Sequence, residues 1–210
     1  HRVMISNTTG IQNTAVGALS LDANTTGDNN TACGEGALSS NTTASNNTAV
    51  GFQALEDNTT GTGNCAVGVL ALNICTTGTF NTGVGNSALQ VNQTGGFNSV
   101  LGVQAGADVT SGSNNLLLGY NAGRSTSPSG QITTGSNNIC LGDNSIANAF
   151  IKVAFTVTSD QRDKIEDGVV SHGLDFVNQL KPKSFWFRKN RDSDEKHGDK
   201  RYGFYAQDIL

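Results

Sequence analysis

A five-residue motif recurs at a fixed spacing along the first 149 residues, and it constrains the fold more than any other feature. Its first residue is Asn, its fourth is Val, Cys or Leu, and its fifth is Gly. Copies begin at Asn13, Asn30, Asn47, Asn64, Asn81, Asn98, Asn115 and Asn138. The spacing is 17 residues until the last copy, which follows after 23 because of an insertion around Pro128. A strict short period with Gly at fixed places is typical of a solenoid.

The length and composition of the repeat favour β-structure. Seventeen residues are too few for a pair of helices, and each Gly would destabilise a helix by about 1 kcal/mol. We therefore expect a strand at each motif, a second short strand or arc at the recurring Ala-Leu pair (Ala37-Leu38 in the second copy), and turns where Gly and Asn accept positive φ. Successive coils would stack about 4.8 Å apart, with ladders of hydrogen-bonded Asn side chains. The predicted fold of residues 1–149 is a mainly β, parallel β-roll solenoid.

Side chains alternate along a strand, so motif residues two and four share one face and residue three takes the other. Since residue four is always Val, Cys or Leu, we expect it inside the coil, in one internal column formed by Val16, Val50, Val67 and Val84. Residue three would then lie outside, where it grows from Ala to Val100 and Leu117. Apolar residues on both faces imply burial against other molecules, and identical protomers about a threefold axis are the simplest source. We predict a homotrimer.

Charge and hydropathy exclude several classes of partner. The net charge is −4 and no basic stripe is present, so we expect no nucleic-acid partner. No apolar run approaches 18 residues and the N-terminus lacks the layout of a signal peptide, so we expect no membrane insertion.

The sequence contains candidates for metal-binding, dinucleotide-binding and N-glycosylation motifs, and each of them has a structural explanation. The four cysteines form no Cys-x-x-Cys pair and have no His at ligand spacing, which predicts free thiols and no metal. Gly83-Val84-Gly85-Asn86-Ser87-Ala88 has the shape of a dinucleotide fingerprint but is one coil's turn, so no cofactor is expected. The Asn-Thr-Thr triplets match glycosylation sequons, and we attribute their recurrence to the coil turn.

The composition changes abruptly at Thr158-Ser159. Most of the charged residues and the only Trp follow this point. Residues 150–158, where apolar and polar residues alternate, predict a connector strand. In residues 159–210, Ser171 is suited to cap a helix that ends before Pro182, Ser184 to Arg188 predicts a strand, and Arg191 to Arg201 a charged loop. This part is predicted to be a small α+β segment.

Three landmarks in residues 159–210 carry a resemblance to a known family. They are Ser159-Asp-x-Arg-x-Lys164, Leu180-x-Pro-x-x-Phe185 and Gly203-Phe-Tyr-Ala-Gln-Asp208. The segment resembles the N-terminal part of the intramolecular chaperone domain at the end of phage endosialidase tail spikes and other viral fibres, a domain that normally continues beyond the Ala-Gln element. The resemblance implies that the domain trimerises the fibre and then cuts itself off. It also implies Ser159 as nucleophile, Lys164 as base and scission of the Thr158-Ser159 bond, in a single turnover and with no other catalytic activity.

The spacing of Ser159 and Lys164 limits how they can meet. Five residues along a helix turn a side chain about 140° away. Either a non-helical turn brings the two side chains together, or packing against neighbouring chains bends the segment, which would make cleavage depend on assembly. The alternative is that Lys164, Asp160 and Asp163 are ordinary surface charges.

Asn46-Asn-Thr-Ala-Val-Gly51 is similar to the repeat of trimeric autotransporter adhesin heads. The solenoid repeat followed by the chaperone resemblance favours a viral tail fibre or tail spike, located in the virion, with a host receptor or glycan as partner. The alternative is a bacterial-type trimeric cell-surface adhesin without self-cleavage. A polysaccharide-degrading spike would need paired carboxylates, whereas the acidic residues of the repeats occupy unrelated coil positions. Ice binding would need Thr-x-Thr on one strand, which the repeats lack.

Overall fold

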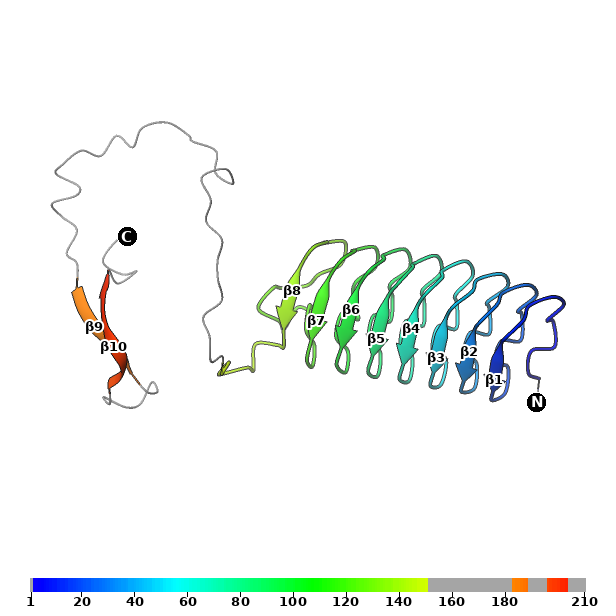
Figure 1. Cartoon of the computed structure of the whole chain (residues 1–210), viewed down its shortest axis with the longest axis horizontal. Coiled ribbons are helices and arrows are strands. Elements are labelled where there is room, and N and C mark those ends of the chain that lie inside the picture. Colours follow the sequence, from blue (N-terminus) through cyan, green and yellow to red (C-terminus); the bar gives the residue numbers. More distant parts are fainter. Residues whose placement is uncertain (1, 151–182, 189–195, 204–210) are drawn as a thin grey trace, which may run out of the picture. The chain divides into compact units, whose positions relative to one another are not determined.

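The structure is a computed structural model that describes residues 2–150, 183–188 and 196–203. The chain divides into two compact units, residues 1–151 and 152–210, which are described separately. In the first unit, eight short strands lie side by side in sequence order and form one parallel sheet (Figure 1). They are β1 (Thr14–Val16), β2 (Thr31–Cys33), β3 (Thr48–Val50), β4 (Cys65–Val67), β5 (Thr82–Val84), β6 (Ser99–Leu101), β7 (Leu116–Leu118) and β8 (Ile139–Leu141). The predicted parallel β-solenoid with 17-residue coils is confirmed.

Equivalent residues of successive coils are stacked on one another. Thr31 pairs with Thr48 and Ala32 with Ala49, and the same register holds from β1 to β8. The wall opposite the sheet consists of turns, so of the two forms expected at the Ala-Leu pair, a short strand or an arc, residues 2–150 show the arc. Leu55 in this wall has a left-handed backbone, with φ of 51°. Its side chain is completely buried, and burial offsets the cost of that conformation.

Asn side chains form two ladders along the stack, as predicted. In the first, the Asn47 backbone N–H donates to Asn30 Oδ1 at 3.0 Å, and Asn47 Nδ2 donates to the Gly61 carbonyl at 2.9 Å. In the second, Asn41 Nδ2 donates to Asn24 Oδ1 at 2.9 Å. The Asn residues of the sequon-like triplets at 24, 41 and 58 are fully buried in this second ladder, which confirms their structural role.

The predicted assignment of the two strand faces is wrong. Motif residue three points inside, since Ala32, Ala49 and Ala66 are completely buried. Motif residue four points outside: Val16 is 58% exposed and Val67 is 36% exposed. Val16, Val50, Val67 and Val84 do stack in one column, but that column lies on the outer face of the sheet.

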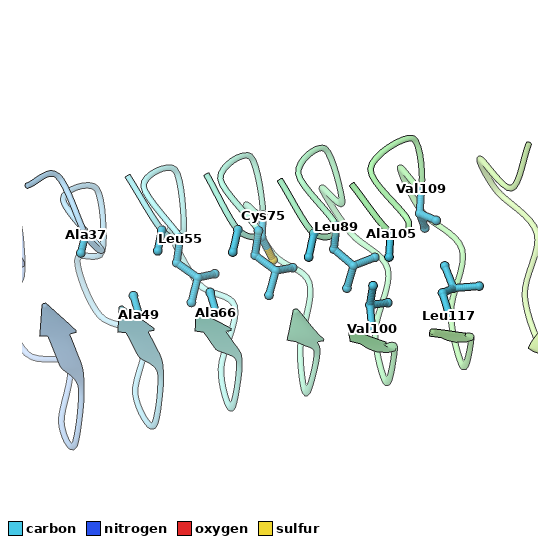
Figure 2. Packing of buried hydrophobic residues seen from close by; sticks show 14 of the residues in the cluster. Ala37, Ala49, Leu55, Ala66, Cys75, Leu89, Val100, Ala105, Val109 and Leu117 are labelled. Carbon is cyan, nitrogen blue, oxygen red and sulfur yellow. The ribbon is translucent and has the colours of Figure 1, made fainter. Parts of the chain in front are cut away.

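The narrow interior explains why Ala is the inward residue. Leucines from the opposite wall, such as Leu55 and Leu89, reach toward the strands and leave room only for small side chains opposite (Figure 2). Where this leucine is replaced by Gly106 or Gly123, the strand residue grows to Val100 or Leu117 and fills the space. A Cβ at Gly106 would lie only 2.9 Å from Leu117 Cδ1, and one at Gly123 only 3.0 Å from it. The side chain at motif residue three is therefore larger in the later coils because it fills the space that the leucine of the opposite wall fills in the earlier ones.

The motif glycine is required by the close stacking of coils. Gly68 has φ of +135°, and a Cβ there would lie 2.5 Å from the carbonyl oxygen of Gly85 in the next coil. At the last coil the side chain of Ile146 takes this place over Gly142, and at the first coil Met4 packs against the core.

In the second unit, β9 (Lys183–Arg188) pairs antiparallel with β10 (Lys196–Gly203), with an irregularity between His197 and Arg201. The predicted strand at Ser184 to Arg188 is confirmed. The predicted loop over Arg191 to Arg201 is wrong from Lys196 onward, because these residues pair with β9. The helix predicted after Ser171 and the connector strand beyond Phe150 lie outside the described residues, and no helix occurs among the described ones.

Candidate functional site

The predicted self-cleavage site lies outside the described residues. This holds for the nucleophile Ser159, the base Lys164 and the scissile bond between Thr158 and Ser159. The dyad therefore remains a prediction from sequence.

The described part of the chaperone-like segment is the β9–β10 hairpin. The Lys200 ammonium lies 5.2 Å from the centroid of the Trp186 ring, within the range of a cation–π interaction. Arg201 pairs with Phe185, and the contact between Lys200 and Trp186 lies beside the irregularity between His197 and Arg201. This contact ties the two strands together across a face where Trp186 is 37% exposed.

The solenoid carries an exposed apolar strip made of two adjoining columns. One column is motif residue four and the other is the residue after the motif glycine. We define the apolar strip as Val50, Phe52, Val67, Val69, Val84, Leu101, Val103, Leu118 and Tyr120. Seven of these side chains are exposed, from Val67 at 36% to Tyr120 at 58%, while Val84 and Leu118 are half-buried. Over the five successive coils from β3 to β7 the two columns contain these nine apolar residues, one polar residue, Asn86, and no charged residue. A strip of this length is typical of a surface that another molecule covers.

A second feature lies at the other end of the strands, where the chain turns into the motif. The residue before each motif asparagine forms a row along the solenoid, and Phe80 and Phe97 stand next to each other in this row. Their rings are stacked, with centroids 5.4 Å apart and an interplanar angle of 17°. Phe97 also borders a groove of about 350 Å³. The groove is lined by Phe97, Ser99, Asn114, Asn115, Leu116, Asn137, Asn138 and Ile139, none of which is charged.

Among the described residues of the solenoid, charged side chains form two separate ion pairs. Arg2 pairs with Asp22 at 3.4 Å, and Arg124 pairs with Asp108 at 3.2 Å. Among the residues described, no group of three His, Cys, Asp or Glu side chains could hold a metal ion. Within the same residues, no helix is long and apolar enough to cross a membrane.

The family comparison concerns the second unit, which contains the three landmarks and the β9–β10 hairpin. Residues 159–210 match the family model described as the chaperone of endosialidase. A β-solenoid followed by this chaperone segment fits a phage tail fibre with a C-terminal chaperone domain. Neither the curated proteins nor the solved structures contain a match to the chain.

Proposed function

We propose that this chain is part of a trimeric phage tail fibre or tail spike in the virion. The solenoid serves as a shaft or receptor-binding head, and the chaperone segment drives assembly and then removes itself. The observation that carries this proposal is the match of residues 159–210 to the chaperone of endosialidase family, directly after a regular solenoid.

The apolar strip supports the trimer. Each exposed Val, Leu or Phe in it leaves apolar surface in water, at a free-energy cost of roughly 25 cal/mol per Å². A partner that covers the whole strip must repeat at the coil spacing over five coils. Another copy of this chain has that period, and a closed threefold arrangement gives every copy a covered strip.

Self-cleavage follows a Ser-Lys scheme in this proposal. Neutral Lys164 Nζ accepts the hydroxyl proton of Ser159, and Ser159 Oγ bonds to the carbonyl carbon of Thr158. The Thr158–Ser159 C–N bond breaks, and its nitrogen receives the proton from Lys164. Water then hydrolyses the Thr158 ester and frees the carboxylate of Thr158 and the Ser159 hydroxyl. Release of the chaperone leaves a kinetically trapped trimer, since the part that lowered the folding barrier is gone.

Mass spectrometry of the full-length protein tests this scheme. We expect a wild-type product that ends at Thr158 and no such product from Ser159→Ala or Lys164→Ala. Both variants are expected to assemble, because neither change removes a large apolar contact. Cleavage at another bond, or cleavage that persists in Ser159→Ala, rules out the proposed dyad.

The second candidate is a trimeric cell-surface adhesin. The similarity of Asn46 to Gly51 to adhesin head repeats favours it. An adhesin of this kind keeps its C-terminal part, so an uncleaved full-length chain on a cell surface would favour it over a tail fibre.

A further inference from the structure

Phe80 and Phe97 lie in the row before the motif asparagine, where the backbone conformation favours Asn or Gly. In this row the chain adopts a left-handed conformation, with φ of 54° at Phe80 and 59° at Phe97. Other coils place short or flexible residues here: Gln12, Asn29, Asn46, Gly63, Asn114 and Asn137. Asn and Gly tolerate left-handed φ, whereas a bulky residue adopts it at a cost.

Burial does not offset this cost at Phe97. The left-handed leucines of the core, such as Leu55 and Leu89, are completely buried, but Phe97 is 63% exposed. Phe80 has a structural neighbour, because its ring lies against Gly63 and a Cβ there would lie 2.6 Å from Phe80 Cδ1. Phe97 stacks on Phe80 and also lines the groove. An exposed aromatic residue held in a costly conformation beside a groove indicates a binding role.

The groove combines an aromatic ring, aliphatic walls and a polar rim. Leu116 and Ile139 contribute aliphatic surface, and Ile139 is 72% exposed. On the rim, Asn114 Nδ2 donates to Asn137 Oδ1 at 2.8 Å. This pairing leaves the Asn114 amide oxygen to accept and the Asn137 amide nitrogen to donate further hydrogen bonds. The ligand that suits this lining has one apolar face and vicinal hydroxyl groups at its edge.

A pyranose ring has these properties, and we propose that the groove binds one pyranose ring of a neutral glycan. The C–H groups of the sugar lie against Phe97 and the aliphatic walls, and neighbouring hydroxyls donate to Asn114 and accept from Asn137.

The charge distribution excludes an anionic sugar. No charged residue lines the groove. Residues 2–150 contain no Lys, and their two arginines, Arg2 and Arg124, are both paired with aspartates. A carboxylate in the groove would therefore lose hydration without gaining a cation.

The groove and the apolar strip occupy different columns. The groove lies between the row that contains Phe97 and motif residue two, whereas the strip consists of motif residue four and the residue after the motif glycine. Motif residues two and four share the outer face of the sheet, so the proposal requires a trimer contact that stops at the strip. Sugar binding itself is inferred from the groove. Only the origin of the sugar, a glycan on the host surface, rests on the proposed role in host attachment.

Saturation-transfer NMR on the full chain tests the proposal. The probes are the methyl glycosides of galactose, glucose, mannose and N-acetylglucosamine, with the methyl glycoside of N-acetylneuraminic acid as the anionic counterpart. We expect transfer to the ring protons of at least one neutral probe and none to the anionic one. Phe97→Asn, which installs the residue that other coils use and so preserves the fold, is expected to weaken binding about tenfold or more. Phe150→Ala removes an exposed ring outside the groove and should bind like the wild type.

Three outcomes would overturn the proposal: no transfer to any neutral probe, equal binding by Phe97→Asn, or equal transfer to the anionic probe. A Ser99→Cys variant checks whether the groove is covered instead by another segment or another copy. Protection of that cysteine from a maleimide would also overturn the proposal. Sedimentation of the same samples separates sugar binding from trimer formation. A monomer that binds the sugar contradicts the trimeric tail-fibre proposal and leaves the sugar-binding proposal intact.

Discussion

At the scale of single residues, the second Asn ladder has a visible defect. Cys75 takes the position that Asn24, Asn41 and Asn58 hold in earlier coils, and the ladder is interrupted there. Asn58 Oδ1 and both polar side-chain atoms of Asn92 are buried without a hydrogen-bond partner among the described residues. Buried polar atoms without partners destabilise the folded state, so this coil is a weak point of the stack.

Cys75→Asn should repair the ladder. The new Nδ2 can donate to Asn58 Oδ1, and the new Oδ1 can accept from Asn92 Nδ2. We expect the free energy of unfolding to rise by about 1 to 2 kcal/mol, measured by denaturant unfolding. Cys65→Ser, a change on the outer face, serves as the control and should have a small effect. An unchanged or lower stability of Cys75→Asn would show that the defect is not the missing hydrogen bonds.

The Cys75 thiol also predicts a pH dependence of stability. Burial raises its pKa from the ordinary value near 9.0 to about 12, against a smaller lowering by the Gly78 backbone. The folded state therefore holds the proton more tightly than the unfolded state, and the resulting stabilisation is complete below pH 9 and is lost as the pH rises toward 12. At about pH 10.5 the wild type should have lost about 2 kcal/mol relative to Cys75→Ala. Parallel stability curves for the two proteins between pH 8 and about 11 would contradict this account.

At the scale of elements, the strands and the ladders could be predicted because each follows from a local repeat. The alternation of side chains was predicted correctly, but the choice of inner face was not. Ala and Val are both apolar, so composition does not separate them. The deciding factor is the width of the coil, which limits the size of the inward side chain. The sequence shows this only when two positions of one coil are compared: Ala66 lies opposite Leu72, whereas the larger Val100 lies opposite Gly106.

Substitutions at neighbouring residues of β4 test the corrected assignment. Ala66→Asp places an unpaired charge in the core and should prevent folding, at a cost of several kcal/mol. Val67→Asp places the same charge on the outer face and should leave the circular dichroism spectrum of the solenoid unchanged. Folding of Ala66→Asp together with unfolding of Val67→Asp would support the opposite face assignment.

The groove could not be predicted from the repeat, because residues that depart from the repeat create it. Phe97, Leu116 and Ile139 come from three successive coils, and the equivalent positions are small or polar in earlier coils except for Phe80 before Phe97 and Leu116 itself before Ile139. The available signal was a bulky residue where Asn and Gly otherwise recur. The Ser159–Lys164 dyad rests on motif resemblance, and its geometry depends on residues outside the described part of the chain.

At the scale of the whole molecule, a regular solenoid is followed by a segment that matches the chaperone of endosialidase family. A stack of coils stabilises itself through the ladders and the inner core. Among the described residues of a single chain, the apolar strip stays exposed. Covering it through self-association is the role we assign to trimer assembly, and assembly is the step that a chaperone segment would assist.

Sedimentation equilibrium of the full chain at micromolar concentration tests this central claim most directly. We predict a mass of three chains for the wild type. We also predict a shift toward monomer for Val67→Asp, which would bring three like charges together in the strip while the coil itself stays folded. A stable wild-type monomer at that concentration, or a trimer that Val67→Asp leaves intact, would contradict the account.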